Sequence, residues 1–222
     1  MPKKLTFYEK DNPRLLINHN PDLFNEIHPT KNEGYEHFYL TLLKATTRKI
    51  WWLGKCGHEW ETSVLIRTYG GSCPYCAGRK VLKGFNDLAS VRPDLASEWH
   101  PTKNGDLQPS DMTYGSNLKV WWRCHHGHEW ETKIAKRTQP FGTGCPTCTN
   151  RIVLKGFNDL ATTHPELANE WHPTKNGDLQ PTDVSFGANK KVWWQCPRCG
   201  HEWQKTLNAR TSTGQIHLHC KQ

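Results

Sequence analysis

The stretch LKVWWRCHHGHEWETKI, residues 118–134, contains the features that decide the fold. Its two halves, residues 118–124 and 128–134, are rich in the β-branched and aromatic residues that are typical of strands. A short turn separates them. We therefore predict a β-hairpin whose turn carries Cys124 and His128, two residue types that bind metal ions in proteins.

The surrounding sequence repeats. PDLASEWHPTKNGDLQP at residues 93–109 returns as PELANEWHPTKNGDLQP at residues 165–181, and a shorter copy, PDLFNEIHPTKN, covers residues 21–32. A Trp pair and a GHEW tetrapeptide follow each copy. The period of 72 residues, measured from Trp99 to Trp171, predicts a tandem array of small units rather than one domain with one active site.

The repeats predict the domain organisation and an α+β fold class. Each unit is expected to contain short helices, a turn, a β-hairpin with a metal-binding turn, and a second ligand-bearing loop. In the helical part, Asn86 or Asn158 is expected to cap a first turn, and Pro93 or Pro165 to start a second one. The predicted segments are a basic leader at 1–18 and repeats at 19–80, 81–152 and 153–222.

Composition favours a metal over disulfides as the stabilising element. The chain has 222 residues and nine cysteines, and the cysteines occur as CPYC and CPTC pairs rather than as a disulfide ladder. The N-terminal sequence lacks the apolar core of a signal peptide, and no stretch is long and apolar enough for a membrane span. We therefore expect a cytoplasmic protein in which thiols remain reduced. Small units commonly need a metal or disulfides for stability, and reduced thiols favour the metal.

The middle repeat contains the clearest set of metal ligands. Cys124 and His128 precede Cys145 and Cys148. Four such ligands close a tetrahedron around zinc and leave no position for a substrate, so this site would be structural. His126 is an alternative to His128, but a histidine occupies the position of His128 in all three repeats.

The other two repeats offer related ligand sets, so the sequence predicts about three structural zinc ions per chain. In the first repeat Gly54 replaces Cys124, and the candidates are Cys56, His58, Cys73 and Cys76. The third repeat ends the chain with a changed second pair. Its candidates are Cys196, His201, His217 and Cys220, with Cys199 and His219 as alternates.

Taken together, the EWHPTKN, VWW, GHEW and CPxC motifs resemble the zinc-ribbon repeat family of treble-clef-like domains, which occurs in tandem. The resemblance covers nearly the whole chain after about residue 18. It implies a zinc-bound unit in which the Cys before GHEW, its His and the CPxC pair are the ligands. It also implies nucleic-acid association. Gly54 and His217 depart from the family pattern.

Basic residues recur at fixed positions, and the net charge of +8 favours polyanionic partners. Repeated positive charge suits a phosphate backbone, so we predict that the chain binds nucleic acid, DNA rather than RNA. The alternative is that the lysines are solvated edge charges and that the arginines brace the zinc loops. The candidates are Arg67, Arg137 and Arg210 after the second strand, Lys49, Lys119 and Lys191 before the Trp pair, and Lys31, Lys103 and Lys175 in HPTKN.

The eleven tryptophans could stack on bases, but their spacing favours a core. The two residues of each Trp pair point to opposite faces of a strand. One of each pair is therefore expected to pack against the GHEW tryptophan of its own repeat, which is Trp60, Trp130 or Trp203.

Two further functions stay open. The first is a scaffold for protein interaction or assembly, because stacked repeats present an extended surface. The second is a metal-dependent nuclease or its accessory subunit, suggested by His100, Asn104, His172 and Asn176. A catalytic cluster apart from the zinc ligands is missing, and the HPTKN histidine is better explained as a helix-end cap for backbone carbonyls. We expect a non-enzymatic protein without a small-molecule substrate, and a nuclease or assembly component as its possible protein partner.

Overall fold

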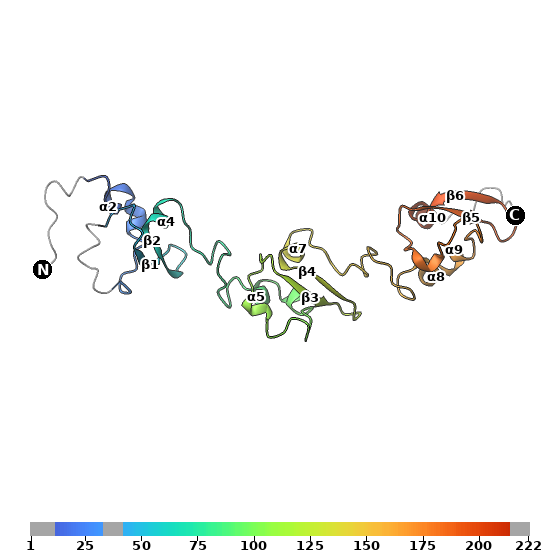
Figure 1. The fold of residues 1–222 in the computed structure, drawn as a ribbon, viewed down its shortest axis with the longest axis horizontal. Helices are drawn as coiled ribbons and strands as arrows, with labels where there is room; N and C mark the ends of the chain where they lie inside the picture. The colour runs from blue at the N-terminus through green and yellow to red at the C-terminus, as the bar shows by residue number, and fades with distance from the viewer. Residues whose placement is uncertain (1–11, 33–41, 214–222) are drawn as a thin grey trace. The chain divides into compact units, whose positions relative to one another are not determined.

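A computed structural model describes residues 12–32 and 42–213. Secondary-structure elements recur in the same order along the chain (Figure 1). The middle repeat contributes to two compact units. One comprises Met1–Ser97 and Asn104–Asn117, and the other Glu98–Lys103 and Leu118–Gln222.

Each repeat contains two short helices, an antiparallel two-stranded hairpin and one helix after the hairpin. The second and third repeats also contain a short 3-10 helix before the hairpin, labelled η2 and η3. In the first repeat these are α2 (Leu16–His19), α3 (Pro21–Phe24), β1 (Lys49–Leu53), β2 (Glu59–Ser63) and α4 (Val64–Thr68). The second contains α5 (Leu88–Val91), α6 (Pro93–Ala96), η2 (Pro109–Asp111), β3 (Lys119–Arg123), β4 (Glu129–Lys133) and α7 (Ile134–Thr138). The third contains α8 (Leu160–Thr163), α9 (Pro165–Ala168), η3 (Pro181–Asp183), β5 (Lys191–Gln195), β6 (Glu202–Thr206) and α10 (Leu207–Thr213).

The predicted hairpins are confirmed, and their registers are equivalent. Trp122 pairs with Trp130 in the β3–β4 ladder, as Trp52 pairs with Trp60 in β1–β2. The turn after β3 closes through a hydrogen bond from the Cys124 amide to the His128 carbonyl, 3.1 Å long. Gly127 has a φ of 83° in this turn, a conformation that favours glycine. The hairpin therefore positions both metal-ligand candidates of its turn.

One tryptophan of each pair forms the centre of its repeat, as the alternation predicted. Trp52, Trp122 and Trp194 are fully buried. The indole N–H of each donates to a carbonyl of the facing strand, at 3.0 to 3.1 Å. Burial of a large apolar ring without an unsatisfied donor is the favourable case for tryptophan. The hairpin thus provides both the core and the frame of the metal centre.

The helical part differs from the prediction at its first cap. Asp87, not Asn86, accepts the amide hydrogen bond that caps α5, from Ser90 at 2.9 Å, and Asp159 caps α8 in the same way. The asparagines are unavailable because their side chains bond to the preceding loop. The expected starts of the second helices are confirmed, since α6 and α9 begin at proline.

A helix follows the second strand of every repeat, where the sequence predicted only a path into a loop. In α7 the side chain of Ile134 is fully buried, and this apolar anchor holds the helix against the hairpin end. Within residues 12–32 and 42–213, no helix has the length and apolar character required to cross a membrane.

Candidate metal centres and their surroundings

The middle repeat brings four predicted ligands together. The ligand atoms of Cys124, His128, Cys145 and Cys148 all lie within 4.8 Å of one another. The His128 Nδ1 atom lies 3.3 to 3.7 Å from the three sulfurs, and the Cys124 and Cys148 sulfurs are 3.8 Å apart. A tetrahedron with zinc–sulfur bonds of about 2.3 Å and a zinc–nitrogen bond of about 2.0 Å has edges of about 3.5 to 3.8 Å. The four ligand atoms fit zinc.

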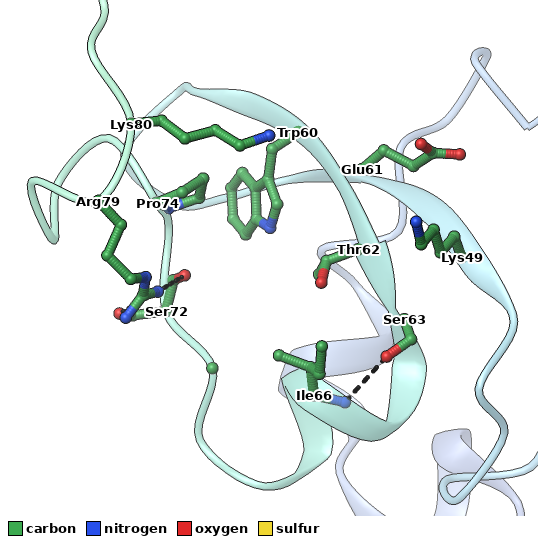
Figure 2. Close-up of a pocket in the computed structure, with 11 residues that line it drawn as sticks. Lys49, Trp60, Glu61, Thr62, Ser63, Ile66, Ser72, Pro74, Arg79 and Lys80 are labelled. Atoms are coloured by element: carbon green, nitrogen blue, oxygen red, sulfur yellow. Dashed lines mark hydrogen bonds between the residues drawn. The ribbon is translucent and has the colours of Figure 1, made fainter.

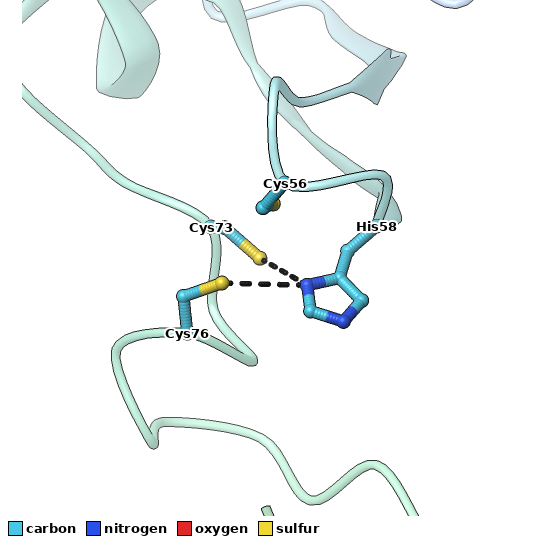
Figure 3. A group of neighbouring side chains, drawn as sticks. All are labelled: Cys56, His58, Cys73 and Cys76. Carbon is cyan, nitrogen blue, oxygen red and sulfur yellow. Dashed lines mark hydrogen bonds between the residues drawn. The ribbon is translucent and has the colours of Figure 1, made fainter. Parts of the chain in front are cut away.

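The first repeat forms an equivalent set from Cys56, His58, Cys73 and Cys76 (Figure 3). The His58 Nδ1 atom lies 3.6 Å and 3.3 Å from the Cys73 and Cys76 sulfurs. A side chain at Gly54 would meet the Trp60 ring at 2.9 Å and the Cys56 sulfur at 3.2 Å. The Cys56 sulfur therefore lies 3.2 Å from the place that a Cβ at position 54 would take, and it joins His58 in a set in which a C-x-H turn replaces C-x3-H.

The third repeat is described in part. Cys196 is buried, and its amide donates to the His201 carbonyl at 2.9 Å, the same turn bond as in the middle repeat. Cys199 also lies in this turn, whereas the candidates His217, His219 and Cys220 are outside the described residues. With two complete sets and this third turn, the chain has about three zinc sites.

His126 remains separate from the middle set. Its ring centroid is 6.0 Å from that of His128, and its ring lies tilted against that of His125, with centroids 3.9 Å apart. The set of four closes without it. Among the two histidines that the sequence left open, the geometry thus favours His128.

The thiols themselves favour a bound cation. Partial burial of the sulfur and the neighbouring Cys145 and Cys124 thiols raise the pKa of Cys148 to about 12. The same causes, with Cys56 and Cys73 as neighbours, raise the pKa of Cys76 to about 11. Thiolates in such a group repel one another unless positive charge lies among them, and zinc supplies that charge. This donor chemistry fits a structural zinc and does not require a disulfide.

The segment that joins consecutive repeats packs against the metal centre of the preceding one. The Phe157 ring meets the ring of His128 edge-on with centroids 4.4 Å apart, and Phe85 meets His58 at 4.3 Å. Asn158 is 4% exposed, and its side-chain amide donates to the carbonyls of Thr147 at 2.7 Å and Ile152 at 2.9 Å. The zinc loop is thus held by residues that follow it.

We define the linker clamps as the pairs Asn86–Asp87 and Asn158–Asp159. In each pair the asparagine binds the zinc loop of one repeat, and the aspartate caps the first helix of the next. The sequence did not predict this role for the asparagines. The signal was present, since the VLKGFNDLA segment occurs twice without change.

Replacing Asn158 by alanine should loosen the second zinc loop and the start of α8 together. The substitution leaves the buried carbonyl of Thr147 without this donor, and a loss of about 2 to 3 kcal/mol in local stability is expected. Hydrogen exchange of zinc-loaded protein would measure it. Asn169→Ala, an exposed asparagine after α9, is the control. Unchanged protection of the loop in the Asn158 variant would contradict the clamp.

Three predicted nucleic-acid contacts lie inside the repeats. The exposed fraction is 5% for Arg137 and 2% for Arg210, and the Arg67 side chain is 10% exposed. Each guanidinium lies over a core tryptophan. Each is ion-paired within its own repeat and brings little charge to the surface, which favours the alternative that these arginines brace the repeat over the prediction that they contact phosphate. The pairs are Arg67–Glu26, Arg137–Glu98 and Arg210–Glu170.

The HPTKN motif is held by a buried histidine. The His100 Nδ1 atom accepts from the amides of Thr102 and Lys103, at 3.2 and 3.1 Å, so the expectation that it caps carbonyls is wrong. An acceptor at Nδ1 places the proton on Nε2, which lies 2.9 Å from Glu129. In the third repeat the equivalent contact, from His172 to Glu202, is a hydrogen bond of 2.8 Å. In His172 both ring nitrogens thus form hydrogen bonds within the repeat.

The lysine of HPTKN is neutralised locally. Lys103 Nζ is 2.6 Å from Glu129 and lies 4.3 Å from the centre of the Trp121 ring. Lys103, and then His100, lower the pKa of Glu129 to about 2, so this carboxylate stays charged. Lys31 and Lys175 make the same pair of contacts in their repeats. Their charge is therefore less available to an external anion.

A third group of predicted contacts remains exposed. Lys49, Lys119 and Lys191 are the first residues of β1, β3 and β5 and occupy the same register. All three are exposed. None forms an ion pair with a carboxylate in the part of the chain that the structure describes.

Comparison with known families agrees with this geometry. The family model described as "Probable Treble clef zinc finger domain" matches residues 23–79, 95–151 and 167–222, together more than half of the chain. Each match spans a hairpin and its metal-binding turn. No curated protein matches the chain.

Proposed function

Since this chain belongs to the family of probable treble clef zinc finger domains, we propose that it is a non-enzymatic array of zinc-stabilised modules that binds nucleic acid, DNA ahead of RNA. Zinc in closed four-ligand sites supplies stability and no reactive position. The proposed contacts are to the phosphate backbone, because exposed lysines recur at one position of each hairpin.

One observation carries this proposal. The exposed lysines at the start of each hairpin, Lys49, Lys119 and Lys191, recur at one register, whereas the other predicted cations are paired with glutamates. In β3–β4 the partner of Lys119 is Lys133. Two like charges directly opposite each other are unfavourable, and an anion between them would relieve the repulsion. The net charge of +8 supports the same class of partner.

The test is a salt titration of binding to mixed-sequence duplex DNA, single-stranded DNA and RNA. Replacing Lys49, Lys119 and Lys191 by glutamine should weaken binding to duplex DNA. If each lysine neutralises one phosphate, the slope of log affinity against log salt should become shallower by about 2.7. The measurement requires zinc-loaded protein throughout.

The control variant replaces Lys31, Lys103 and Lys175 by glutamine, which removes the same formal charge from paired positions. Its slope should change much less. An equal loss in both variants would mean that only net charge matters. Absence of binding by the unaltered protein at low salt would overturn the proposal in favour of a protein-interaction scaffold.

A further inference from the structure

A groove runs beside the second strand of the first repeat, between β2 and the zinc loop (Figure 2). Its volume is about 450 Å³. Trp60 and Thr62 come from the strand, and Ser72, Pro74 and Arg79 from the loop. The groove is therefore built by two elements that the zinc set joins, since Cys73 lies between Ser72 and Pro74.

The second repeat has a groove at the equivalent place. Its volume is about 390 Å³. Trp130, Thr132, Pro146 and Arg151 line it, and these occupy the positions of Trp60, Thr62, Pro74 and Arg79. An irregular surface depression would not be expected to recur in two repeats with the same residue types around it. The recurrence indicates a feature that belongs to the repeat.

Each groove has a guanidinium fixed at its rim. Arg79 Nη2 donates to the Ser72 carbonyl at 2.6 Å, and Arg151 Nε donates to the Thr149 hydroxyl at 3.1 Å. Among the described residues no carboxylate forms an ion pair with either arginine. An arginine held in this way keeps further N–H donors for an external anion, and the fork of a guanidinium suits phosphate.

Cations exceed carboxylates in both grooves. Besides its arginine, the first groove has Lys49 and Lys80, against the single carboxylate of Glu61. The second has Lys136 and Arg151 against Glu131. Lys49 is also one of the hairpin lysines in the proposed backbone contact, so this surface is continuous with the groove.

An exposed aromatic ring extends from the same loop in both repeats. Tyr69 is 81% exposed and Phe141 is 98% exposed. Tyr69 precedes the groove residues Gly71 and Ser72, and Phe141 precedes Thr143 and Gly144. Exposed aromatic side chains beside a positive groove are the elements with which proteins hold single-stranded nucleic acid, one stacking on bases and the other following phosphates.

We propose that each groove holds one segment of a single-stranded nucleic acid, with a phosphate at Arg79 or Arg151 and an unpaired base against Tyr69 or Phe141. This inference rests on the proposed nucleic-acid function and specifies its ligand. A duplex offers no free base face to these rings, so the single strand is the form that uses both parts of the site.

The test compares two double variants of the full chain with zinc bound. Arg79→Gln with Arg151→Gln should reduce the salt slope for a mixed-sequence single-stranded oligonucleotide by about 1.4, as expected for two lost phosphate contacts. Tyr69→Ala with Phe141→Ala should weaken single-strand binding roughly tenfold or more and leave the salt slope unchanged. Zinc content should stay the same in both.

The matched control is Lys55→Gln with Arg123→Gln, two exposed cations that do not line either groove. Single-strand affinity that is equally weakened in this control would overturn the groove and leave general charge attraction. Unchanged single-strand affinity in both groove variants, with duplex binding still sensitive to Lys49, Lys119 and Lys191, would overturn the groove alone. Failure of the unaltered protein to bind any nucleic acid would remove both proposals.

Discussion

Replacing Cys145 by serine is expected to release one zinc ion per molecule and to unfold the middle metal centre. The Cys145 sulfur is buried and lies 3.7 Å from His128 Nδ1, and a serine hydroxyl does not replace a thiolate as a zinc ligand. Binding of a structural zinc contributes on the order of 10 kcal/mol, whereas an isolated two-stranded hairpin is marginal in water. Native mass spectrometry would count the ions, and hydrogen exchange would locate the unfolding.

The loss of structure in the Cys145 variant should extend from the ligand set toward the C-terminus, into the start of the third repeat. The clamp at Asn158–Asp159 ties the second zinc loop to the cap of α8, so protection at the start of α8 should fall as well. The first set, around Cys73, should keep its zinc. His126→Ala is the control, because His126 is outside the set of four and its replacement should leave the zinc count unchanged. An unaltered count in the Cys145 variant would contradict the ligand assignment.

The hairpins and the middle ligand set were predictable because their signals are local. Alternation along VWW places Trp122 in the core, and Cys124 and His128 belong to one tight turn. The second pair of cysteines follows at a spacing found in many zinc sites. Where sequence-adjacent residues make the structure, pattern alone is sufficient.

In the first repeat the sequence pattern does not predict how the ligand set is completed. The sequence predicts Cys56 as a candidate ligand in a repeat where Gly54 replaces the expected cysteine, but spacing alone does not show how the shorter turn completes the set. In the structure the Trp60 ring and the Cys56 sulfur both lie against Gly54, at 2.9 Å and 3.2 Å from the place that a Cβ would take. Such a compensation depends on three-dimensional packing between the turn and the strand, which spacing does not describe.

The roles of polar residues were the least predictable part. Arg137 and Glu98 are 39 residues apart, so nothing local indicated that the arginine is buried in an ion pair. The sequence predicts a helix cap at Asn158 because asparagine favours caps. Its amide instead binds carbonyls of a loop before it, which only the fold brings into reach.

Replacing Arg137 by alanine is the second change with a large expected effect, on stability rather than on binding. Its guanidinium donates to Glu98 at 2.7 Å and lies 4.3 Å from the centre of the Trp122 ring. Breaking a buried pair costs about 3 to 5 kcal/mol, and we expect the lower end because the Glu98 side chain is 29% exposed and regains some hydration. Hydrogen exchange of the β3–β4 hairpin would measure this loss.

A double-mutant cycle separates the ion pair from simple packing. Glu98→Ala alone leaves a buried cation, so the double variant should be less unstable than the sum of the two single variants, by about 1 to 3 kcal/mol. Arg123→Ala, on the exposed face of β3, is the matched control and should leave hairpin protection nearly unchanged. Zinc content should be the same in the unaltered protein and in every variant. Arg137 is 5% exposed, so it can reach a phosphate only when its repeat opens. Weaker DNA binding by the Arg137→Ala variant, with a hairpin as stable as before, would therefore contradict the structural role and make the side chain a surface contact.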